Sequence, residues 1–316
     1  MNLHLRRTYP IVLVFTLLML ALACLSPGFP GAYSLPFFVL VMVTTGLPHG
    51  ATDHLIDRYQ QEQQGKSFSW HRFLAVYLGA IVLYGILWIG VPLLSLAVFL
   101  LISAFHFGQS QFLYVEGPEN SPFKWALYLT WGLCILTAII GLNAKESGQV
   151  LAALIPQTQW TGLASWMLVA LGIFGVATVG LLSWARLKGH LSRGSFGREL
   201  GHLLLLTLLS WQADLLLTFA VYFGLWHSLA SISYEIRIMQ EERPNFSWRD
   251  FVKAALPFSL ISIVGIGMLL GTAYWLEEWV SLYLLFFMAI SVLTLPHMVF
   301  MQGFYYHGQK KLLEFL

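Results

Sequence analysis

The chain has 316 residues, of which 58% are hydrophobic and only 10% are charged. A soluble domain carries about 25% charged residues, so this composition predicts a polytopic membrane protein without room for a large soluble domain. The net charge of +2 gives no reason to expect a nucleic-acid partner. Cys24 and Cys134 lie far apart in apolar runs, which argues against a disulfide framework and against a cysteine metal site.

Ten apolar segments approach or reach the roughly 20 residues that a helical span needs. Backbone groups in lipid must be satisfied internally, so these segments are predicted to be helices rather than open sheet. We therefore predict an all-α membrane bundle that forms a single integral domain over residues 1–316. The spans are predicted at about 9–26, 33–52, 73–91, 92–111, 124–142, 164–184, 197–211, 213–235, 252–275 and 279–300.

Three features of the sequence bear on the limits of these spans. The first segment follows Arg6 and Arg7 and ends near Ala23, a pattern that also fits a secretory signal peptide, although we favour an uncleaved helix. The seventh and eighth segments are separated only by the short turn from Trp211 to Asp214. The third and fourth share one apolar run that is broken at Pro92.

The basic residues predict the orientation of the bundle. Sixteen of the 17 Lys and Arg residues fall in the two termini and in alternate loops, and Lys145 is the exception. Cytoplasmic loops carry an excess of Lys and Arg, so both termini are predicted to be cytoplasmic. This strict alternation also supports the number of ten spans.

Histidines occur near the C-terminal ends of four segments. They are His49 in GLPHGATDH, His106 in SAFHFG, His227 in FGLWHSL and His297 in LTLPHM. All four segments are predicted to run inward, and at a rise of 1.5 Å per residue each histidine lies roughly 5–12 Å from its cytoplasmic helix end. An ionisable residue inside a membrane predicts a functional site, and neutral imidazole is a common ligand for iron, zinc and copper. The shared depth therefore predicts a single metal site.

Neighbouring residues add to this hypothesis. Asp53 follows His49 by four residues and shares its face if the helix continues, so its carboxylate would orient that imidazole; a loop cap or a pair with Arg58 is the alternative. His202 is a fifth and weaker candidate because charged residues flank it. Each histidine also has an ordinary interpretation as a hydrogen-bonded residue at a helix end.

The four histidine motifs, in this order, resemble those of the bacteriorhodopsin-related (Brp/Blh) family of β-carotene 15,15′-dioxygenases. The resemblance covers residues 33–302, and PHGATDH is its most specific part. It implies a multi-pass protein of a bacterial or archaeal cell membrane that binds Fe(2+). Such an enzyme uses O2 to cleave the central double bond of β-carotene into two retinal molecules, with membrane lipid as its surroundings and an indirect link to a rhodopsin.

Residue by residue, the resemblance implies His49, His106 and His227 as iron ligands, and we place His297 as the fourth. Ser231 stands where the family often has a second histidine, and Gln109 and Gln111 stand where it often has an aspartate. Asp53 and Ser231 are then expected to support the ligands from outside. Four aromatic residues are predicted to line a tunnel for the carotenoid: Phe105, Phe107, Tyr222 and Trp226.

Three other functions remain open at this point. A di-iron desaturase or hydroxylase would need more histidines than the four or five available here. A membrane transporter fits the prolines next to His49 and His297, but paired acidic residues are missing from the spans. A family member that binds carotenoid or retinal without cleaving it is the third, and Ser231 motivates it.

Overall fold

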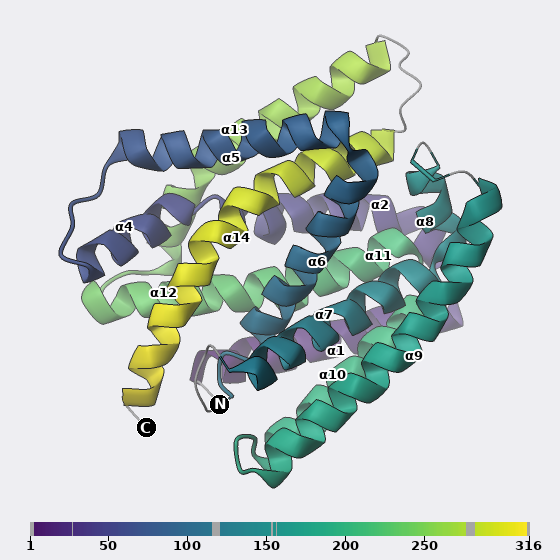
Figure 1. The fold of residues 1–316 in the computed structure, drawn as a ribbon, viewed down its shortest axis with the longest axis horizontal. Helices are drawn as coiled ribbons and strands as arrows, with labels where there is room; N and C mark the ends of the chain where they lie inside the picture. The colour runs from purple at the N-terminus through teal and green to yellow at the C-terminus, as the bar shows by residue number, and fades with distance from the viewer. Residues whose placement is uncertain are drawn as a thin grey trace.

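The structure is a computed structural model that describes residues 3–26, 28–115, 121–152, 154–155, 157–275 and 282–314. Every regular element in these ranges is helical, which confirms the predicted all-α bundle (Figure 1). The helices are α1 (Leu3–Leu25), α2 (Phe29–Val41), α3 (Leu47–Gly50), α4 (Asp53–Gln63), α5 (Trp70–Gly90), α6 (Pro92–Gln111), α7 (Pro122–Leu142), α8 (Ala144–Leu151), α9 (Gln157–Leu187), α10 (Arg193–Gln212), α11 (Leu215–Phe219), α12 (Leu229–Glu242), α13 (Trp248–Trp275) and α14 (Leu282–Glu314). Two π-helical segments, η1 (Met42–Gly46) and η2 (Ala220–Ser228), join α2 to α3 and α11 to α12.

Nine helical stretches within the described residues are long and apolar enough to cross a membrane. The seventh predicted span corresponds to α10, which is not among them and begins with a charged turn. The total of ten spans therefore stays a prediction. The first residues of the last predicted span, 279–281, lie outside the described residues.

Two breaks between helices, before Pro92 and near Asp214, lie at residues that interrupt helical geometry. Val91 interrupts the run between α5 and α6 with an irregular backbone, and Pro92 starts α6 because its ring fits the first helical turn. The backbone of α10 ends at Gln212, and the Asp214 carboxylate accepts a hydrogen bond from the Leu217 N–H at the start of α11. The chain therefore reverses within a few residues at the short turn between α10 and α11.

The two π-helical segments pack against each other in the interior. Gly224 lets η2 lie against the end of α2 and the start of η1, since a Cβ there would collide with the side chain of Val41. A π-helical turn widens the helix and re-aims the side chains that follow, and such turns are frequent at functional sites. Here η1 directly precedes the turn that carries His49, and η2 contains His227.

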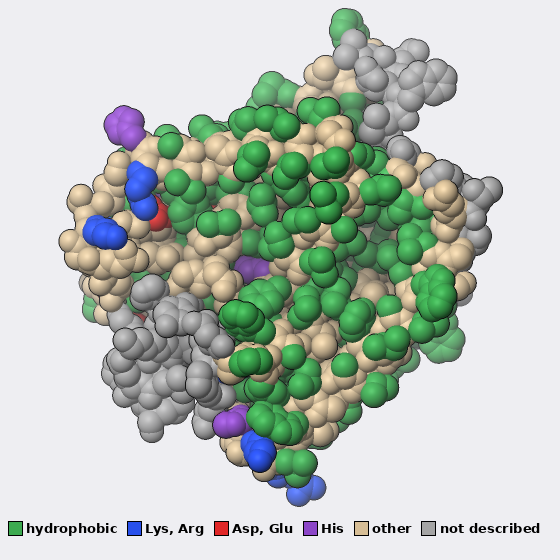
Figure 2. All heavy atoms as spheres, viewed as in Figure 1, with side chains coloured by type: hydrophobic (Ala, Val, Ile, Leu, Met, Phe, Trp, Pro, Cys, Tyr) green, Lys and Arg blue, Asp and Glu red, His purple; other side chains and the backbone are tan. Residues whose placement is uncertain are grey.

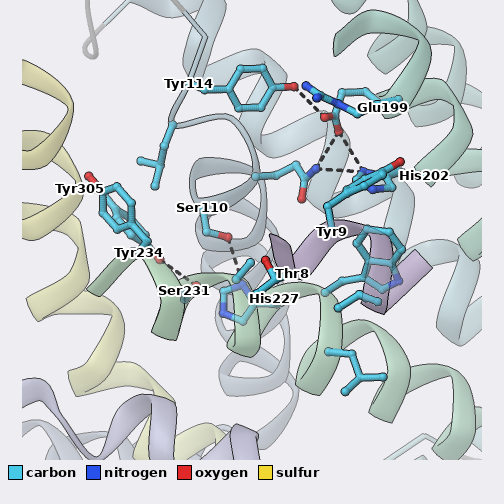
Figure 3. Close-up of a pocket in the computed structure, with 17 residues that line it drawn as sticks. Thr8, Tyr9, Ser110, Tyr114, Glu199, His202, His227, Ser231, Tyr234 and Tyr305 are labelled. Carbon is cyan, nitrogen blue, oxygen red and sulfur yellow. Dashed lines mark hydrogen bonds and ion pairs between the residues drawn. The ribbon is translucent and has the colours of Figure 1, made fainter. Parts of the chain in front are cut away.

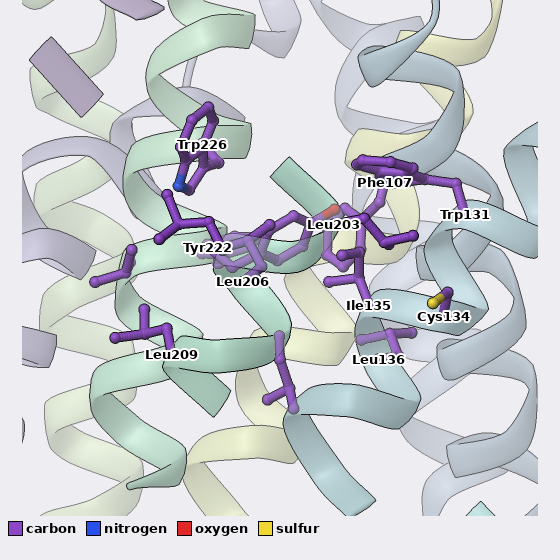
Figure 4. Packing of buried hydrophobic residues seen from close by; sticks show 14 of the residues in the cluster. Phe107, Trp131, Cys134, Ile135, Leu136, Leu203, Leu206, Leu209, Tyr222 and Trp226 are labelled. Atoms are coloured by element: carbon purple, nitrogen blue, oxygen red, sulfur yellow. The ribbon is translucent and has the colours of Figure 1, made fainter. Parts of the chain in front are cut away.

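The helices α6 and α7 approach each other closely through two glycines. A Cβ at Gly108 would collide with the backbone of Tyr128, and a Cβ at Gly132 would collide with the backbone of Ala104. Small residues allow such backbone contact in membrane proteins. The adjoining core buries aromatic and aliphatic side chains from α6, α7, α10 and η2 (Figure 4): Phe107, Trp131, Ile135, Leu206, Leu209 and Tyr222.

Helices at the periphery expose apolar side chains instead. In α5 and in α13, only 17% of the residues of the apolar stretch are buried. In the helical stretch from Leu215 to Glu242, which includes η2 and α12, the buried share is 67%. Hydrophobic side chains cover much of the face shown in Figure 2, and basic side chains lie at its margins. Lipid is the solvent that such a surface fits, because it satisfies apolar groups without a hydrophobic penalty. The chain is therefore a polytopic membrane protein with η2 and α12 at its centre.

Candidate metal centre

The structure brings together the four histidines that the sequence places at one depth. The four imidazoles come from four separate elements: His49 from α3, His106 from α6, His227 from η2 and His297 from α14. Their ring centroids are 4.4 Å apart for His49 and His297, and 4.9 Å apart for His106 and His227. All four side chains are buried. We call this group the histidine cluster.

Three of these imidazoles have a hydrogen-bond partner on the Nδ1 atom. The Nδ1 atom of His49 lies 2.8 Å from Oε1 of Glu235, and the Nδ1 atom of His297 lies 2.7 Å from Oδ1 of Asp53. Ser110 Oγ lies 3.0 Å from His227 Nδ1, and the serine hydroxyl donates to the Phe107 carbonyl. The hydroxyl oxygen is thus left to accept from His227, and the carboxylates accept from the other two. These bonds assign the proton of the His49, His227 and His297 imidazoles to Nδ1.

The Nε2 atoms of these three residues therefore carry lone pairs. Potential ligand atoms of His49, His106 and His297 converge, and His227 joins them by ring contacts with His49 and His106, with centroids 5.2 and 4.9 Å apart. The Nε2 atoms of His49 and His297 lie 3.0 Å apart, and the Nε2 atom of His106 is buried without a hydrogen-bond partner. One potential ligand atom each from His49, His106 and His297 lies within 4.8 Å of the others. Facing lone pairs repel one another unless a cation lies between them. The donor set thus fits a divalent transition metal, for which imidazole is a suitable ligand.

The partner of Asp53 differs from the one predicted. The helix that carries His49 ends at Gly50, and a turn at Ala51 and Thr52 precedes α4, so the four-residue helical spacing does not hold. Asp53 instead contacts His297 from the first turn of α4. The expectation that Asp53 orients His49 was wrong because it assumed an uninterrupted helix.

Glu235 is the functional candidate that the sequence reasoning missed. It lies two turns beyond His227 on α12 and is buried. Besides its contact with His49, its second oxygen accepts a hydrogen bond of 2.8 Å from the Thr52 hydroxyl. A carboxylate at the last residue of a predicted span was the available signal, because a charge there needs a partner.

An apolar cavity of about 330 Å3 has all four histidines in its wall. Its lining continues between α5, α13 and α14 with Phe73, Leu74, Leu78, Phe258, Ile261 and Leu293. Leu78 and Ile261 line the cavity and are also 53% and 67% exposed on the outside of the bundle. The cavity therefore opens sideways, on the surface that faces lipid. Histidine atoms are visible near the middle of the apolar face in Figure 2.

The predicted tunnel residues separate into two groups. Phe107 lines the apolar cavity, whereas Trp226 lines a second, smaller cavity. Phe105 packs on Tyr128, and Tyr222 packs on Phe107 in the core, and neither lines the apolar cavity. Of the four residues predicted to line a carotenoid tunnel, Phe107 alone lies in the wall of the apolar cavity, because the sequence does not fix the direction of a side chain around a helix in the interior.

Ser231 and His202 lie outside the histidine cluster. The hydroxyl of Ser231 lies 3.2 Å from the Tyr305 hydroxyl, and the ring of Tyr305 stacks on His106 with centroids 5.8 Å apart. Ser231 is thus linked to His106 of the cluster through the Tyr305 side chain, and its supporting role stays a prediction. His202 pairs with Glu199 instead, at 3.3 Å.

Comparison with known proteins agrees with the motifs. A family model described as "Beta-carotene 15,15'-dioxygenase" matches residues 40–305. A protein of an uncultured marine bacterium, named beta-carotene 15,15'-dioxygenase, is 26% identical over 82% of this chain and 90% of its own length. A Halobacterium salinarum protein, named probable beta-carotene 15,15'-dioxygenase Blh, is 27% identical over 81% of this chain and 79% of its own length. No solved structure shows significant similarity to the chain. The chain thus belongs to the β-carotene 15,15′-dioxygenase family and is an enzyme of the dioxygenase class.

Proposed function

We propose that this protein is a membrane dioxygenase that cleaves the central double bond of β-carotene with O2, giving two retinal molecules. One observation carries the proposal: four imidazoles converge in the wall of an apolar cavity that opens toward lipid. The two similar proteins named for this reaction support the choice of substrate. The membrane of a bacterial or archaeal cell is the expected location.

The histidine cluster would hold Fe(2+) through Nε2 of His49, His106, His227 and His297. Iron(II) would supply the electrons that make O2 reactive toward a carbon–carbon double bond. Asp53 and Glu235 would orient two of the ligands by accepting their Nδ1–H groups. Buried charges require partners, and the two positive charges of the metal ion would balance these two carboxylates.

The apolar cavity would hold the middle of the carotenoid. Its volume of about 330 Å3 is near the lower end of the range of roughly 300–1,000 Å3 for ligand sites, so a long polyene would extend through the side opening. Phe107 and Ile290 would contact the chain near the histidines and fix which double bond lies there. Their side chains also exclude water, which protects the reaction from side products. Both O2 and retinal dissolve in lipid and would use the same opening.

Binding without cleavage is the second candidate, and Ser231 is the observation that favours it. Its hydroxyl faces Tyr305, so no imidazole comes from a position at which the family often has one. His297, in the last helix, would supply the fourth imidazole instead, since its Nε2 atom lies 3.0 Å from that of His49. Activity of the unmodified chain would exclude the non-catalytic alternative.

Expression in a bacterial host that accumulates β-carotene tests the proposed activity. We expect the orange colour to fade and retinal to appear in the pigment extract. A His49→Ala variant should leave the colour unchanged, and the exposed-histidine variant His71→Ala should behave like the unmodified chain. Unchanged β-carotene with the protein present in the membrane would contradict the proposal.

A further inference from the structure

The second cavity, of about 90 Å3, differs from the first in its chemistry (Figure 3). Its wall is formed by the N-terminal part of α1, the end of α6, the first turns of α10, and parts of η2, α12 and α14. One water molecule needs at least roughly 10–15 Å3 of such space, so this cavity has room for several. His227 lines both cavities, and it is the one member of the histidine cluster in the polar wall. We call the second cavity the polar cavity.

The polar cavity contains a second pair of a carboxylate and an imidazole, on α10. Glu199 accepts hydrogen bonds of 2.7 Å from the Tyr114 hydroxyl and from the Gln111 amide, and its Oε2 atom lies 3.3 Å from Nδ1 of His202. Burial and the Glu199 charge raise the pKa of Tyr114 well above its ordinary range, so this hydroxyl remains a donor. Glu199 is therefore held in place from three sides.

The other ring nitrogen of His202 is available. The Nε2 atom of His202 is buried without a hydrogen-bond partner, and the side chain is only 5% exposed. The ring is fixed between Tyr9 and Trp226, with centroids 5.0 and 4.1 Å away. The Nδ1 atom of His202 lies 3.3 Å from Oε2 of Glu199 and 3.2 Å from the Gln111 amide nitrogen. In the tautomer whose Nδ1–H donates to the carboxylate, Nε2 keeps its lone pair, as it does in His49 beside Glu235. A carboxylate-oriented imidazole with a free nitrogen is suited to bind a metal ion in this cavity.

A metal ion needs a polar route to the histidine cluster. A divalent cation cannot cross the apolar cavity without losing its hydration, and charge in hydrocarbon is costly. The polar cavity begins at the partly exposed residues Tyr9 and Arg198 and reaches His227, whose Nδ1 atom is bonded to Ser110. Figure 3 shows Ser110 and His227 between the side of Glu199 and the side of Ser231. Polar side chains of Glu199, Gln111 and Ser110 thus line this cavity between the surface and one ligand of the proposed centre, among apolar neighbours.

We propose that the polar cavity is the uptake route for the metal ion, with Glu199 and His202 as its transit ligands. This inference rests on the proposed function, because it requires a metal in the histidine cluster. Arg198 lies at the rim, with its guanidinium over the Tyr9 ring and bonded to Ser195. Its positive charge opposes cation capture, so ligation by the pair, rather than the net charge of the rim, provides the attraction.

The rate of metal uptake tests this role separately from activity. The full chain in detergent is stripped of metal with a chelator and mixed with Co2+, and visible absorption follows the formation of Co2+–imidazole bonds. We expect Glu199→Gln and His202→Gln to take up Co2+ about tenfold more slowly, since local charge and ligands change ionic on-rates by at least this factor. The final amount of Co2+ per chain should equal that of the unmodified protein, because neither residue belongs to the histidine cluster.

Arg198→Gln is the matched control, since it alters the neighbouring residue on the same turn of α10 and removes a positive charge. Its uptake should be no slower than that of the unmodified protein. Equal rates in all four proteins would overturn the inference while leaving the proposed centre intact. A lower final amount of Co2+ at an unchanged uptake rate would also overturn the inference. Glu199 and His202 would then contribute to the equilibrium binding of the metal rather than to its uptake. An unmodified chain that binds no Co2+ would contradict the proposed metal centre itself, and the route with it.

Discussion

The apolar cavity and the polar cavity share His227 and differ in size, in position and in the side chains that line them. The apolar cavity is the larger, opens between peripheral helices and contains all four clustered histidines. The polar cavity is smaller, lies at the end of the bundle that carries the N-terminus and has Glu199 and His202 in its wall. An enzyme that joins a lipid-soluble substrate to an ionic cofactor has to admit both without admitting bulk water. Separate routes that share one ligand solve this problem.

Removal of a histidine from the cluster is expected to have the largest effect. His49→Ala, His106→Ala, His227→Ala and His297→Ala should each lose the bound iron, because each one removes an imidazole from the cluster. His71→Ala and His190→Ala change residues outside the cluster and should retain it. Iron content of the purified proteins, measured by mass spectrometry, checks this. Full occupancy in one of the four variants would remove that residue from the ligand set.

Changes to the two buried carboxylates, Asp53 and Glu235, are expected to have the second-largest effect on metal binding. Glu235→Gln and Asp53→Asn keep the shape of the side chain but weaken the hold on His49 and His297. We expect metal affinity to fall by about 10–100-fold, as for other residues that orient metal-bound histidines. Competition with a chelator of known affinity measures this change. Glu241→Gln, on the exposed side of the same helix as Glu235, is the control and should leave affinity unchanged.

A bulky side chain in the wall of the apolar cavity should hinder entry of the substrate without changing metal binding. Ile81 lines the cavity on α5, and Ile81→Trp should lower kcat/KM for β-carotene by about tenfold while iron content stays the same. Leu83→Trp places the same ring two residues along, at an exposed site that does not line this cavity. Equal activity of the two tryptophan variants would show that the carotenoid approaches by another path.

The smallest expected effect concerns the tautomer of His227. Ser110→Ala removes the oxygen that accepts from Nδ1, and one neutral hydrogen bond is worth about 0.5–1.5 kcal/mol. Metal affinity should therefore fall by only about threefold, and Ser110→Thr should restore it. A loss as large as that of His227→Ala would indicate that the serine itself is a ligand.

The grouping of the four histidines could be predicted from the sequence, because it depends only on the residue type and on its depth in the membrane. The alternation of basic loops predicted that four helices run in the same direction with their histidines at one depth, and the rings of His49, His106, His227 and His297 lie in contact. The details that failed depend on local breaks in helical geometry. The turn at Ala51 and Thr52 moved Asp53 from His49 to His297, and the π-helical stretch before Ser228 changed which way η2 side chains face.

Other features had no sequence signal of sufficient strength. Glu235 acts on a histidine from a helix far away in the chain, and such pairings depend on packing rather than on spacing. The polar cavity joins the N-terminal helix α1 to α10, and neither segment carries a recognisable motif. His202 was ranked below the others for its charged neighbours, and one of those neighbours, Glu199, is the residue that positions it.

X-ray absorption at the iron edge of the anaerobically purified protein tests the central claim most directly. Four imidazoles on a single iron(II) give scattering from nitrogen neighbours and from the more distant atoms of about four rings. That signal, without an iron–iron distance, is the result that we predict from the histidine cluster. A spectrum with two imidazoles or fewer, or with a second iron nearby, would contradict the assignment of these four residues as the metal centre.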